Sequence, residues 1–392
     1  MNNNIFVVTR LGQLRNAHGL ITQQNSKNNV LLILYTPDAM DNLENLKKNI
    51  YKGDFLKVIY FELPFRPLST TVSKCKRIYE MFNNVFDEIV DAYKLENLFI
   101  ANTDNYYKYL EEISIQKNLR LNLFEEGLTT YRMFAKDLQR EFTIRDVRSA
   151  LKRVFKYCKK AFVSMVVFFL KFLSWLTRRN IFDYIKSIRI PKKYRYGHID
   201  HFDEAYVCFP NKLKEMGGEG RISKIKKLDF FVDSSDIQKL TKDIPENSVL
   251  LINQRYIPYD IHFNIIFDIL ERQGEKNVII KFHPKEEQKM YAVHLEEAIK
   301  KHPKLKVKSL YGYDHVPVEN LIPSGKFKRV YSITSSSLLY IKLIDPKIEV
   351  ISIGKSYKEL CLSSKYNVDA GFMNLFNRDY DAFDKLFDLK QV

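Results

Sequence analysis

Residues 119–127 read LRLNLFEEG, a strand pattern that stops at two adjacent carboxylates and a glycine. If this strand belongs to a parallel sheet, Glu125 and Glu126 lie at its carboxyl end, where α/β proteins bind ligands. Repulsion between the carboxylates favours one of them keeping a proton near neutral pH, as general acid–base chemistry requires. Gly127 permits a sharp turn. On its own, the motif is more often an ordinary surface turn.

Strand patterns alternate with helical patterns on both sides of this stretch. The other β-rich runs are Ile5–Thr9, Val30–Tyr35, Lys57–Leu63, Asn97–Asn102, Ala205–Pro210, Val249–Arg255, Asn277–Phe282, Val330–Thr334 and Ile348–Ile353. Strands that alternate with helices imply right-handed crossovers and parallel sheets. Because 392 residues exceed one typical core, we expect two α/β domains.

The positive charge is concentrated in one segment. The chain has a net charge of +16, and residues 145–195 contain fifteen Lys and Arg but two acids. A nucleic-acid groove would draw its charge from several elements, so we do not expect nucleic acid as a partner. The apolar run at 161–176 is interrupted by Lys171 and is shorter than the ~20 residues that span a bilayer. A helix in an anionic membrane interface and a buried core helix with basic ends both remain open.

The cysteines and the N-terminus favour a cytoplasmic protein. Four cysteines are scattered without a Cys-x-x-Cys pair, which indicates neither a zinc site nor a disulfide framework. The N-terminal residues lack the pattern of a signal peptide and lead at once into a strand.

Two further stretches offer groups that bind anions. His283 and Pro284 follow a predicted strand and lie between Lys281 and Lys285, so an anion would meet an imidazole and two cations. The run 334–337, which comprises Thr334, Ser335, Ser336 and Ser337, offers hydroxyls and free N–H groups where a helix begins. A loop histidine and ordinary N-cap serines are the alternatives. Together with the acid pair, these stretches describe an enzyme that activates an acceptor and expels a phosphate-bearing leaving group.

In this order, the motifs resemble those of the bacterial capsular polysialyltransferases. The acidic motif is Glu125-Glu126-Gly127, the His-Pro motif is His283-Pro284, and the serine motif is Ser335-Ser336-Ser337. The similarity also includes residues 11–14, 209–214, 254–256 and 281–286, and therefore covers both halves of the chain. Phe282 stands where a proline is usual, and Ser336 where a bulkier residue occurs.

The resemblance implies an α/β fold with two Rossmann-like domains facing one cleft, the GT-B type. It implies an inverting, metal-independent transfer from CMP-sialic acid to the non-reducing end of a sialic-acid chain, without a cofactor. Glu125 would take the proton and Glu126 support the site, while His283 would bind the departing phosphate. The donor-binding residues would be Lys281, Pro284, Thr334, Ser335, Ser336 and Ser337, and the acceptor-binding residues Arg10, Gln13, Gln254, Arg255 and Lys285.

The bounds of the expected parts follow from the charge and the strand pattern, and their roles are what the resemblance implies. Residues 1–145 would form the acceptor-side domain, 146–200 a membrane- or polymer-binding segment, 201–375 the nucleotide-sugar domain, and 376–392 a helix packing back on the first domain. The protein would work in capsule synthesis at the inner face of the bacterial inner membrane, with capsule export or synthesis proteins as partners. Two other functions stay open: addition of one sialic acid to a lipid-linked oligosaccharide, and non-catalytic binding of polyanions.

Overall fold

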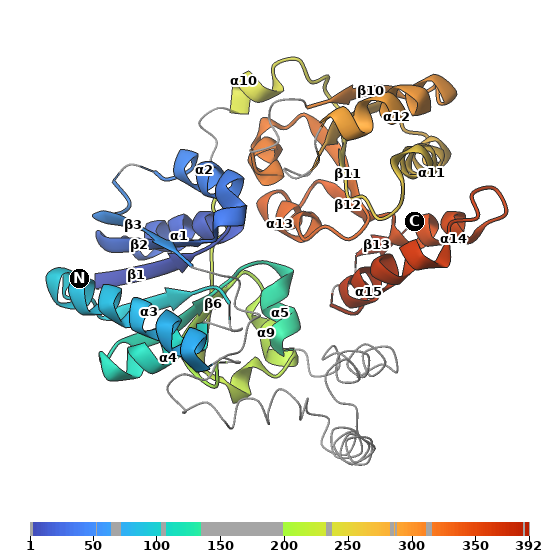
Figure 1. The fold of residues 1–392 in the computed structure, drawn as a ribbon. Helices are drawn as coiled ribbons and strands as arrows, with labels where there is room; N and C mark the ends of the chain where they lie inside the picture. The colour runs from blue at the N-terminus through green and yellow to red at the C-terminus, as the bar shows by residue number, and fades with distance from the viewer. Residues whose placement is uncertain are drawn as a thin grey trace, which may run out of the picture. The chain divides into compact units, whose positions relative to one another are not determined.

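The computed structural model describes residues 3–51, 53–63, 72–102, 107–134, 199–232, 237–282, 286, 288–310, 316–386 and 389–391. The chain forms two compact units, Met1–Asp229 and Phe230–Val392, coloured blue to green and yellow to red in Figure 1. Each unit contains one parallel β-sheet with helical crossovers. The structure thus confirms two Rossmann-like α/β domains.

Within the described residues, the sheet of unit 1 has seven parallel strands in the order β3-β2-β1-β4-β5-β6-β7. The strands are β1 (Asn3–Val8), β2 (Asn28–Tyr35), β3 (Lys57–Glu62), β4 (Asn97–Ile100), β5 (Arg120–Phe124), β6 (Phe202–Val207) and β7 (Ile222–Lys227). The described helices are α1 (Leu11–Gln24), η1 (Pro37–Ala39), α2 (Met40–Lys48), α3 (Val72–Tyr93), α4 (Tyr107–Gln116), α5 (Leu128–Phe134), α9 (Pro210–Glu215) and η4 (Gly218–Gly220). Figure 1 shows α1 and α2 on one face of this sheet and α3 and α4 on the other.

Buried asparagines fix the register at the amino ends of three central strands. Asn4 donates to Asn29 at 3.0 Å, and Asn97 donates to Asn4 at 2.9 Å. These side chains lie on β1, β2 and β4, and all three are buried. Because buried amides are costly unless they are paired, a shift of one residue would break the ladder. The paired asparagines therefore determine which residues follow β1 and β4 at the opposite, carboxyl ends of these strands.

The described part of unit 2 has six parallel strands in the order β10-β9-β8-β11-β12-β13. The strands are β8 (Ser248–Ile252), β9 (Asn277–Lys281), β10 (Lys306–Ser309), β11 (Phe327–Ser332), β12 (Glu349–Ser352) and β13 (Lys390–Gln391). The helices are α10 (Ile237–Thr241), α11 (Tyr259–Arg272), α12 (Gln288–Lys301), η5 (Val318–Ser324), α13 (Ser337–Ile344), α14 (Gly354–Leu362) and α15 (Ala370–Leu386).

The two sheets share one strand order. The first six strands of unit 1 and the six strands of unit 2 both follow the 3-2-1-4-5-6 pattern of doubly wound domains. The order reverses between β1 and β4 in unit 1 and between β8 and β11 in unit 2. In such sheets, ligands bind outside the carboxyl ends of the strands at this point. In each unit, a ligand site is therefore expected at the carboxyl ends of the strands, where the strand order reverses.

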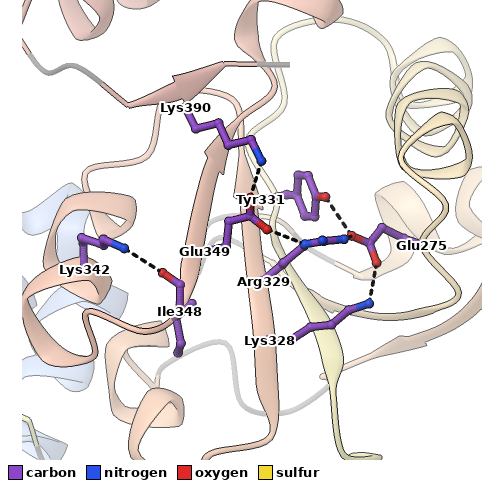
Figure 2. A network of polar contacts seen from close by, with 8 residues as sticks. All are labelled: Glu275, Lys328, Arg329, Tyr331, Lys342, Ile348, Glu349 and Lys390. Atoms are coloured by element: carbon purple, nitrogen blue, oxygen red, sulfur yellow. Dashed lines mark hydrogen bonds and ion pairs between the residues drawn. The ribbon is translucent and has the colours of Figure 1, made fainter.

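An ionic network occupies the opposite, amino-end side of the unit 2 sheet (Figure 2). Glu275, just before β9, accepts hydrogen bonds from Arg329 and Tyr331, each at 2.8 Å. Lys328 lies 3.1 Å from the other oxygen of the same carboxylate. Burial alone would raise the pKa of Glu275, but these hydrogen bonds outweigh it and lower the pKa below its ordinary value. The carboxylate therefore stays ionised and ties β9 to β11.

The same network reaches the last strand of the chain. Arg329 also donates to Glu349 at 2.6 Å, and Lys390 pairs with the second oxygen of Glu349 (Figure 2). Lys390 lies on β13, a two-residue strand that is parallel to β12. So short a strand makes few backbone hydrogen bonds, and the ion pair adds a side-chain contact that holds it in place.

The division between the units differs from the predicted boundary at residue 201. β6 pairs with β5 and β7 pairs with β6, so the chain up to Asp229 completes the sheet of unit 1. The backbone hydrogen bonds between β5 and β6 continue beyond the last residue of β5, because the backbone N–H of Glu125 donates to the carbonyl of Tyr206 at 3.0 Å. The apolar run of β6 comes after the long basic segment and so predicts the first strand of a second domain. In the structure, β6 is the sixth strand of the unit 1 sheet.

The C-terminal helix α15 packs into the core of its own unit, and its contact with the first domain stays a prediction. Met373, Phe376 and Tyr380 of α15 are buried in the hydrophobic core of unit 2. Tyr380 lies directly over Gly354, where a Cβ atom would come within 2.4 Å of the ring. The apolar face of α15 is therefore used within unit 2.

The predicted membrane- or polymer-binding segment 146–200 lies outside the described residues, apart from 199 and 200. In the part of the chain that the structure describes, no helix combines the length and the apolar character needed to cross a bilayer.

Candidate active site

Glu125 is buried at the carboxyl end of β5. Its side chain is fully closed to solvent, and Oε2 accepts hydrogen bonds from the hydroxyl of Tyr131 at 2.6 Å and from the backbone N–H of Cys208 at 2.5 Å. Asn16 of α1 donates to its carbonyl at 2.7 Å. Glu125 therefore connects β5 with α1, α5 and the loop after β6.

The donors to Glu125 keep their protons. The backbone N–H of Phe209 donates to the oxygen of Tyr131 at 3.0 Å, so the Tyr131 hydroxyl uses its own hydrogen for Glu125. Burial, and then the charge of Glu125, raise the pKa of Tyr131. The donor from Cys208 is its backbone N–H, which does not titrate. Glu125 thus has a fixed, neutral pair of donors, and its carboxylate is held in one orientation.

Glu126 lies nearer to the surface and bridges two other strand ends. Its Oε1 lies 3.1 Å from Arg10, which follows β1, and its Oε2 accepts from Asn102, which follows β4, at 3.2 Å. The side chain of Glu126 is 5% exposed, whereas that of Arg10 is 67% exposed. The ion pair therefore lies at the switch point, and its cation faces solvent.

The turn after the acid pair depends on Gly127. Its φ of 129° is a conformation that side chains with a Cβ rarely adopt. The backbone N–H of Glu126 donates to the Thr130 hydroxyl at 2.8 Å, and the Thr130 N–H donates to Gly127 at 3.1 Å. This turn starts α5 and brings Tyr131 back to Glu125. The glycine that the sequence singled out is therefore what lets the two acids have different surroundings.

Gln13 and Arg10 have different environments although both were predicted to bind the acceptor. Gln13 is fully buried, and its Oε1 accepts from the backbone N–H and the hydroxyl of Thr9 at 2.6 and 3.1 Å. It therefore shapes the turn between β1 and α1. Arg10 is exposed and is the one of the two that can meet a ligand directly.

In unit 2, predicted residues meet at the switch point between β8 and β11. Gln254 accepts hydrogen bonds from the backbone N–H of Thr334 at 2.7 Å and from the Ser332 hydroxyl at 3.2 Å. The Tyr256 and Thr334 hydroxyls lie 2.6 Å apart. Arg255 is exposed, with its guanidinium 4.6 Å from the ring centre of Tyr259. Gln254 and Thr334 therefore join the two strand ends, and Arg255 lies beside them.

The serine motif begins α13 at the carboxyl end of β11, as predicted. Ser335 is 9% exposed, and its hydroxyl accepts from the Ser337 N–H at 3.3 Å. Ser336 is the N-cap residue and makes no side-chain capping hydrogen bond. Ser336 and Ser337 are partly exposed. The motif thus presents hydroxyls at a helix N-terminus, an arrangement that suits a phosphate.

The His-Pro motif falls on residues that the structure does not describe. His283, Pro284 and Lys285 lie outside the described residues, between Phe282 and Glu286. Lys281, at the end of β9, is 4% exposed and donates to the carbonyl of Phe282 at 3.1 Å. The Lys281 side chain is therefore buried rather than on the surface.

Several contact residues were missed by the sequence analysis. They are Asn102, Tyr131, Cys208, Asn253, Tyr259 and His262. Asn102 ends a predicted strand next to β5, and that position was a usable signal. The others carry no motif. Within the described residues, no group of three or more His, Cys, Asp or Glu side chains is arranged to hold a metal ion.

Structural comparison supports the two-domain fold. The structure of LpCGTa in complex with UDP matches with a TM-score of 0.52 at 10% identity, covering 98% of this chain and 91% of that one. A UDP-N-acetylglucosamine 2-epimerase from Listeria monocytogenes, described as putative, matches at 0.49 and 9% identity, over 97% and 90% of the two chains. UGT89C1 from Arabidopsis thaliana matches at 0.47 and 11% identity, over 98% of both chains. The fold is of the GT-B type.

Sequence comparison identifies the family. No curated protein matches the chain. The family model described as Alpha-2,8-polysialyltransferase (POLYST) matches residues 4–353, which cover nearly all of unit 1, most of unit 2 and all three motifs. The chain therefore belongs to the alpha-2,8-polysialyltransferase family and is a glycosyltransferase that acts on sialic acid.

Proposed function

We propose that the protein elongates a sialic-acid chain by transferring sialic acid from CMP-sialic acid to its non-reducing end, with inversion and without a metal or cofactor. Family membership supports the substrate class. The observation that carries the chemistry is the Glu126–Arg10 pair at the switch point of unit 1. It places a carboxylate and an exposed cation together, which suits an acceptor that carries both a hydroxyl and a carboxylate.

The geometry favours Glu126 as the general base, whereas the resemblance had assigned that role to Glu125. A base must lie within hydrogen-bonding distance of the hydroxyl that it deprotonates. Glu125 is fully buried and held by Tyr131 and Cys208. Glu126 contacts a side chain that reaches solvent. We therefore assign proton transfer to Glu126 and the positioning of the β5 end to Glu125.

Arg10 would bind the carboxylate of the acceptor sugar. Guanidinium groups pair well with carboxylates, and Arg10 pairs with Glu126 before the acceptor arrives. An acceptor carboxylate that takes over Arg10 would remove a positive charge from Glu126. Losing that charge makes Glu126 a stronger base. Acceptor binding would thus prepare the base for the reaction.

The donor would bind at the carboxyl edge of unit 2. Ser336 and Ser337 would donate hydrogen bonds to the CMP phosphate at the start of α13, and Gln254 and Thr334 would hold the two strand ends in register. Arg255 and the His-Pro motif would add positive charge, and His283 would donate to the departing phosphate oxygen. A monophosphate leaving group carries less charge than a diphosphate, so these groups would suffice without a metal.

Transfer would occur in one displacement. The acceptor oxygen forms a bond to the anomeric carbon while the bond from that carbon to the phosphate oxygen of CMP breaks. The hydroxyl proton passes to Glu126, and the electron pair of the broken bond leaves with CMP. A single displacement inverts the anomeric carbon.

A transfer assay tests this function. The protein is incubated with CMP-sialic acid and a fluorescent α2,8-linked sialic-acid trimer, with and without EDTA, and products are separated by anion-exchange chromatography. We expect a ladder of longer products in both samples and none with a UDP-sugar donor. A single added residue would instead favour a one-step transferase, and no product from several sialylated acceptors would contradict the proposal.

We also propose that the basic segment holds the enzyme at the inner face of the bacterial inner membrane, where capsule polysaccharide is made. The support is its sequence, fifteen cations around an apolar run with the single Trp of the chain. Deletion of residues 162–176 should release the protein from vesicles that contain anionic lipid. Equal sedimentation of the deletion variant and the full chain would count against the anchor.

A further inference from the structure

The side chain of Gln254 has a fixed orientation at the switch point of unit 2. Its Oε1 atom accepts from the backbone N–H of Thr334 at 2.7 Å and from the Thr334 hydroxyl at 3.3 Å. A backbone N–H only donates, so the atom that faces it is the amide oxygen and not the amide nitrogen. Gln254 follows β8 and Thr334 follows β11, the two strands between which the order reverses. The amide therefore cannot turn over without losing these hydrogen bonds.

The other end of the same amide remains a donor. Within the described residues, Nε2 of Gln254 has no hydrogen-bond partner, and the side chain is partly exposed. An amide nitrogen carries two hydrogens and accepts none. Ligands of doubly wound sheets bind outside the carboxyl ends of the strands at the switch point. A ligand there would meet these two N–H groups, so it must offer them a hydrogen-bond acceptor.

Tyr256 keeps Thr334 in the conformation that holds Gln254. The Thr334 hydroxyl donates its one hydrogen to Gln254, so Tyr256 is the donor in the 2.6 Å contact between the two hydroxyls. The Tyr256 ring packs edge-on against Phe376 of α15, with ring centres 5.3 Å apart and planes inclined by 88°. Phe376 is closed to solvent in the core of unit 2. The C-terminal helix thus supports the orientation of Gln254 through Tyr256 and Thr334.

The groups next to Gln254 in the chain and in the sheet favour an anion as the acceptor. Arg255, the following residue, is exposed. Ser336 and Ser337 follow Thr334 at the start of α13 and are partly exposed. The guanidinium of Arg255 and the amide nitrogen of Gln254 can only donate, and an ionised phosphate can only accept. A phosphate therefore suits this set of groups better than a base edge, which presents donors as well as acceptors.

We propose that the amide nitrogen of Gln254 binds the phosphate of the nucleotide-sugar donor, and that Tyr256 and Thr334 are positioning residues that aim it. The resemblance had placed Gln254 with the acceptor. The inference rests on the proposed function, since it assumes that CMP-sialic acid binds at the carboxyl ends of the unit 2 strands. A hydrogen bond to a charged group contributes about 10- to 100-fold in affinity. Free CMP keeps the phosphate, so its binding measures the contact without any transfer.

The first test removes the donor of this side chain and keeps its acceptor. Gln254→Glu leaves an oxygen for the Thr334 N–H and replaces the amide nitrogen by a second oxygen, which repels phosphate. Isothermal titration should show an affinity for CMP that is about 10²-fold weaker, whereas cytidine, which lacks the phosphate, should bind as it does to wild type. Gln273→Glu, at the exposed C-cap of α11, is the matched control and should bind CMP with wild-type affinity.

The second test removes one hydroxyl from the positioning residues. Tyr256→Phe keeps the ring on Phe376 and loses the hydrogen bond to Thr334. KM for CMP-sialic acid should rise about 5-fold, with kcat and the acceptor KM unchanged, whereas general damage to the fold would alter all three. Tyr366→Phe, which loses a hydroxyl hydrogen bond to Asp268 elsewhere in unit 2, is the matched control and should have wild-type kinetics.

Both tests are interpreted at equal folded fraction, measured by thermal unfolding. Wild-type CMP affinity in Gln254→Glu would overturn the proposal, and so would an equal loss for cytidine, which would move the contact to the nucleoside. If Gln254→Glu does not fold, Gln254→Met removes the amide and should weaken CMP binding about 10-fold, and no weakening would again overturn the proposal. Failure of the proposed function is distinguishable, because wild-type protein would then bind no CMP and make no sialylated product.

Discussion

Two buried glutamates, Glu125 in unit 1 and Glu275 in unit 2, have contrasting surroundings. Glu275 lies at the amino-end side of its sheet, and Lys328 and Arg329 neutralise its charge. Glu125 lies at a carboxyl end, and its carboxylate accepts from a hydroxyl and a backbone N–H, beside a second acid. Cationic partners suit a group that stabilises the fold. Neutral, directional donors suit a group that fixes the geometry of its neighbour, Glu126.

Glu126→Gln should have the largest effect on activity. Loss of a general base lowers kcat by about 10³-fold, and the substitution keeps the shape of the side chain. We expect the melting temperature to change little, because glutamine still accepts hydrogen bonds from Asn102 and Arg10, and the exposed Arg10 keeps its contact with water. Steady-state transfer kinetics and thermal unfolding check the two parts. A kcat within tenfold of wild type would refute the assignment of the base.

Glu275→Gln should show the opposite pattern. Removing the charge leaves Lys328 and Arg329 without their buried partner, and we expect a loss of about 2–3 kcal/mol in the free energy of unfolding. The kcat per folded molecule should not change, since the network lies at the amino-end side of the sheet. Urea unfolding measures the first quantity. The control is Glu246→Gln, an exposed partner of Lys326, which should cost under about 1 kcal/mol.

Arg10→Gln should have a smaller and more selective effect. If Arg10 binds the acceptor carboxylate, KM for the sialic-acid trimer should rise about 10-fold, while KM for CMP-sialic acid stays the same. Arg77→Gln, an exposed position on α3, is the matched control. A rise in the KM for CMP-sialic acid alone would contradict the assignment of Arg10 to the acceptor.

The pH dependence of stability should follow Glu275 and Glu349. Hydrogen bonds from Lys390 and Arg329 lower the pKa of Glu349, and those from Arg329 lower the pKa of Glu275 against the effect of burial. Their contribution to stability is therefore complete above the unfolded-state value of 4.5 and is lost as the pH falls through the lowered pKa values. Urea midpoints between pH 7 and pH 3 should fall less steeply in Glu275→Gln than in wild type. Equal slopes would contradict this account of the network.

The strands that carry the motifs were predictable because their signal is local. Buried parallel strands are continuous apolar runs, and residues that follow them gather at one sheet edge. β7 was not predicted, because Ile222–Lys227 contains three lysines and lies at the edge of the sheet. An edge strand buries less of itself, so its pattern is weak. The predicted domain boundary at residue 201 was wrong, because the apolar run of β6 follows the long basic segment and therefore predicts the first strand of a new domain.

The different roles of the two acids could not be predicted from the motif. Glu125 and Glu126 are adjacent, but their partners come from separate parts of the chain. Cys208 is 83 residues from Glu125, and Arg10 is 116 residues from Glu126. These contacts exist because β1, β4, β5 and β6 are neighbours in the sheet. The sequence identified where the acids lie, and the strand order determined which one is buried.

The most direct test of the central claim compares kcat of Glu125→Gln and Glu126→Gln at equal folded fraction, with CMP-sialic acid and the fluorescent trimer. If Glu126 is the base and Glu125 positions it, Glu126→Gln should be at least about 10-fold slower than Glu125→Gln, and Glu125→Gln should be the less stable protein. The reverse order of rates would contradict the account and return the proton transfer to Glu125.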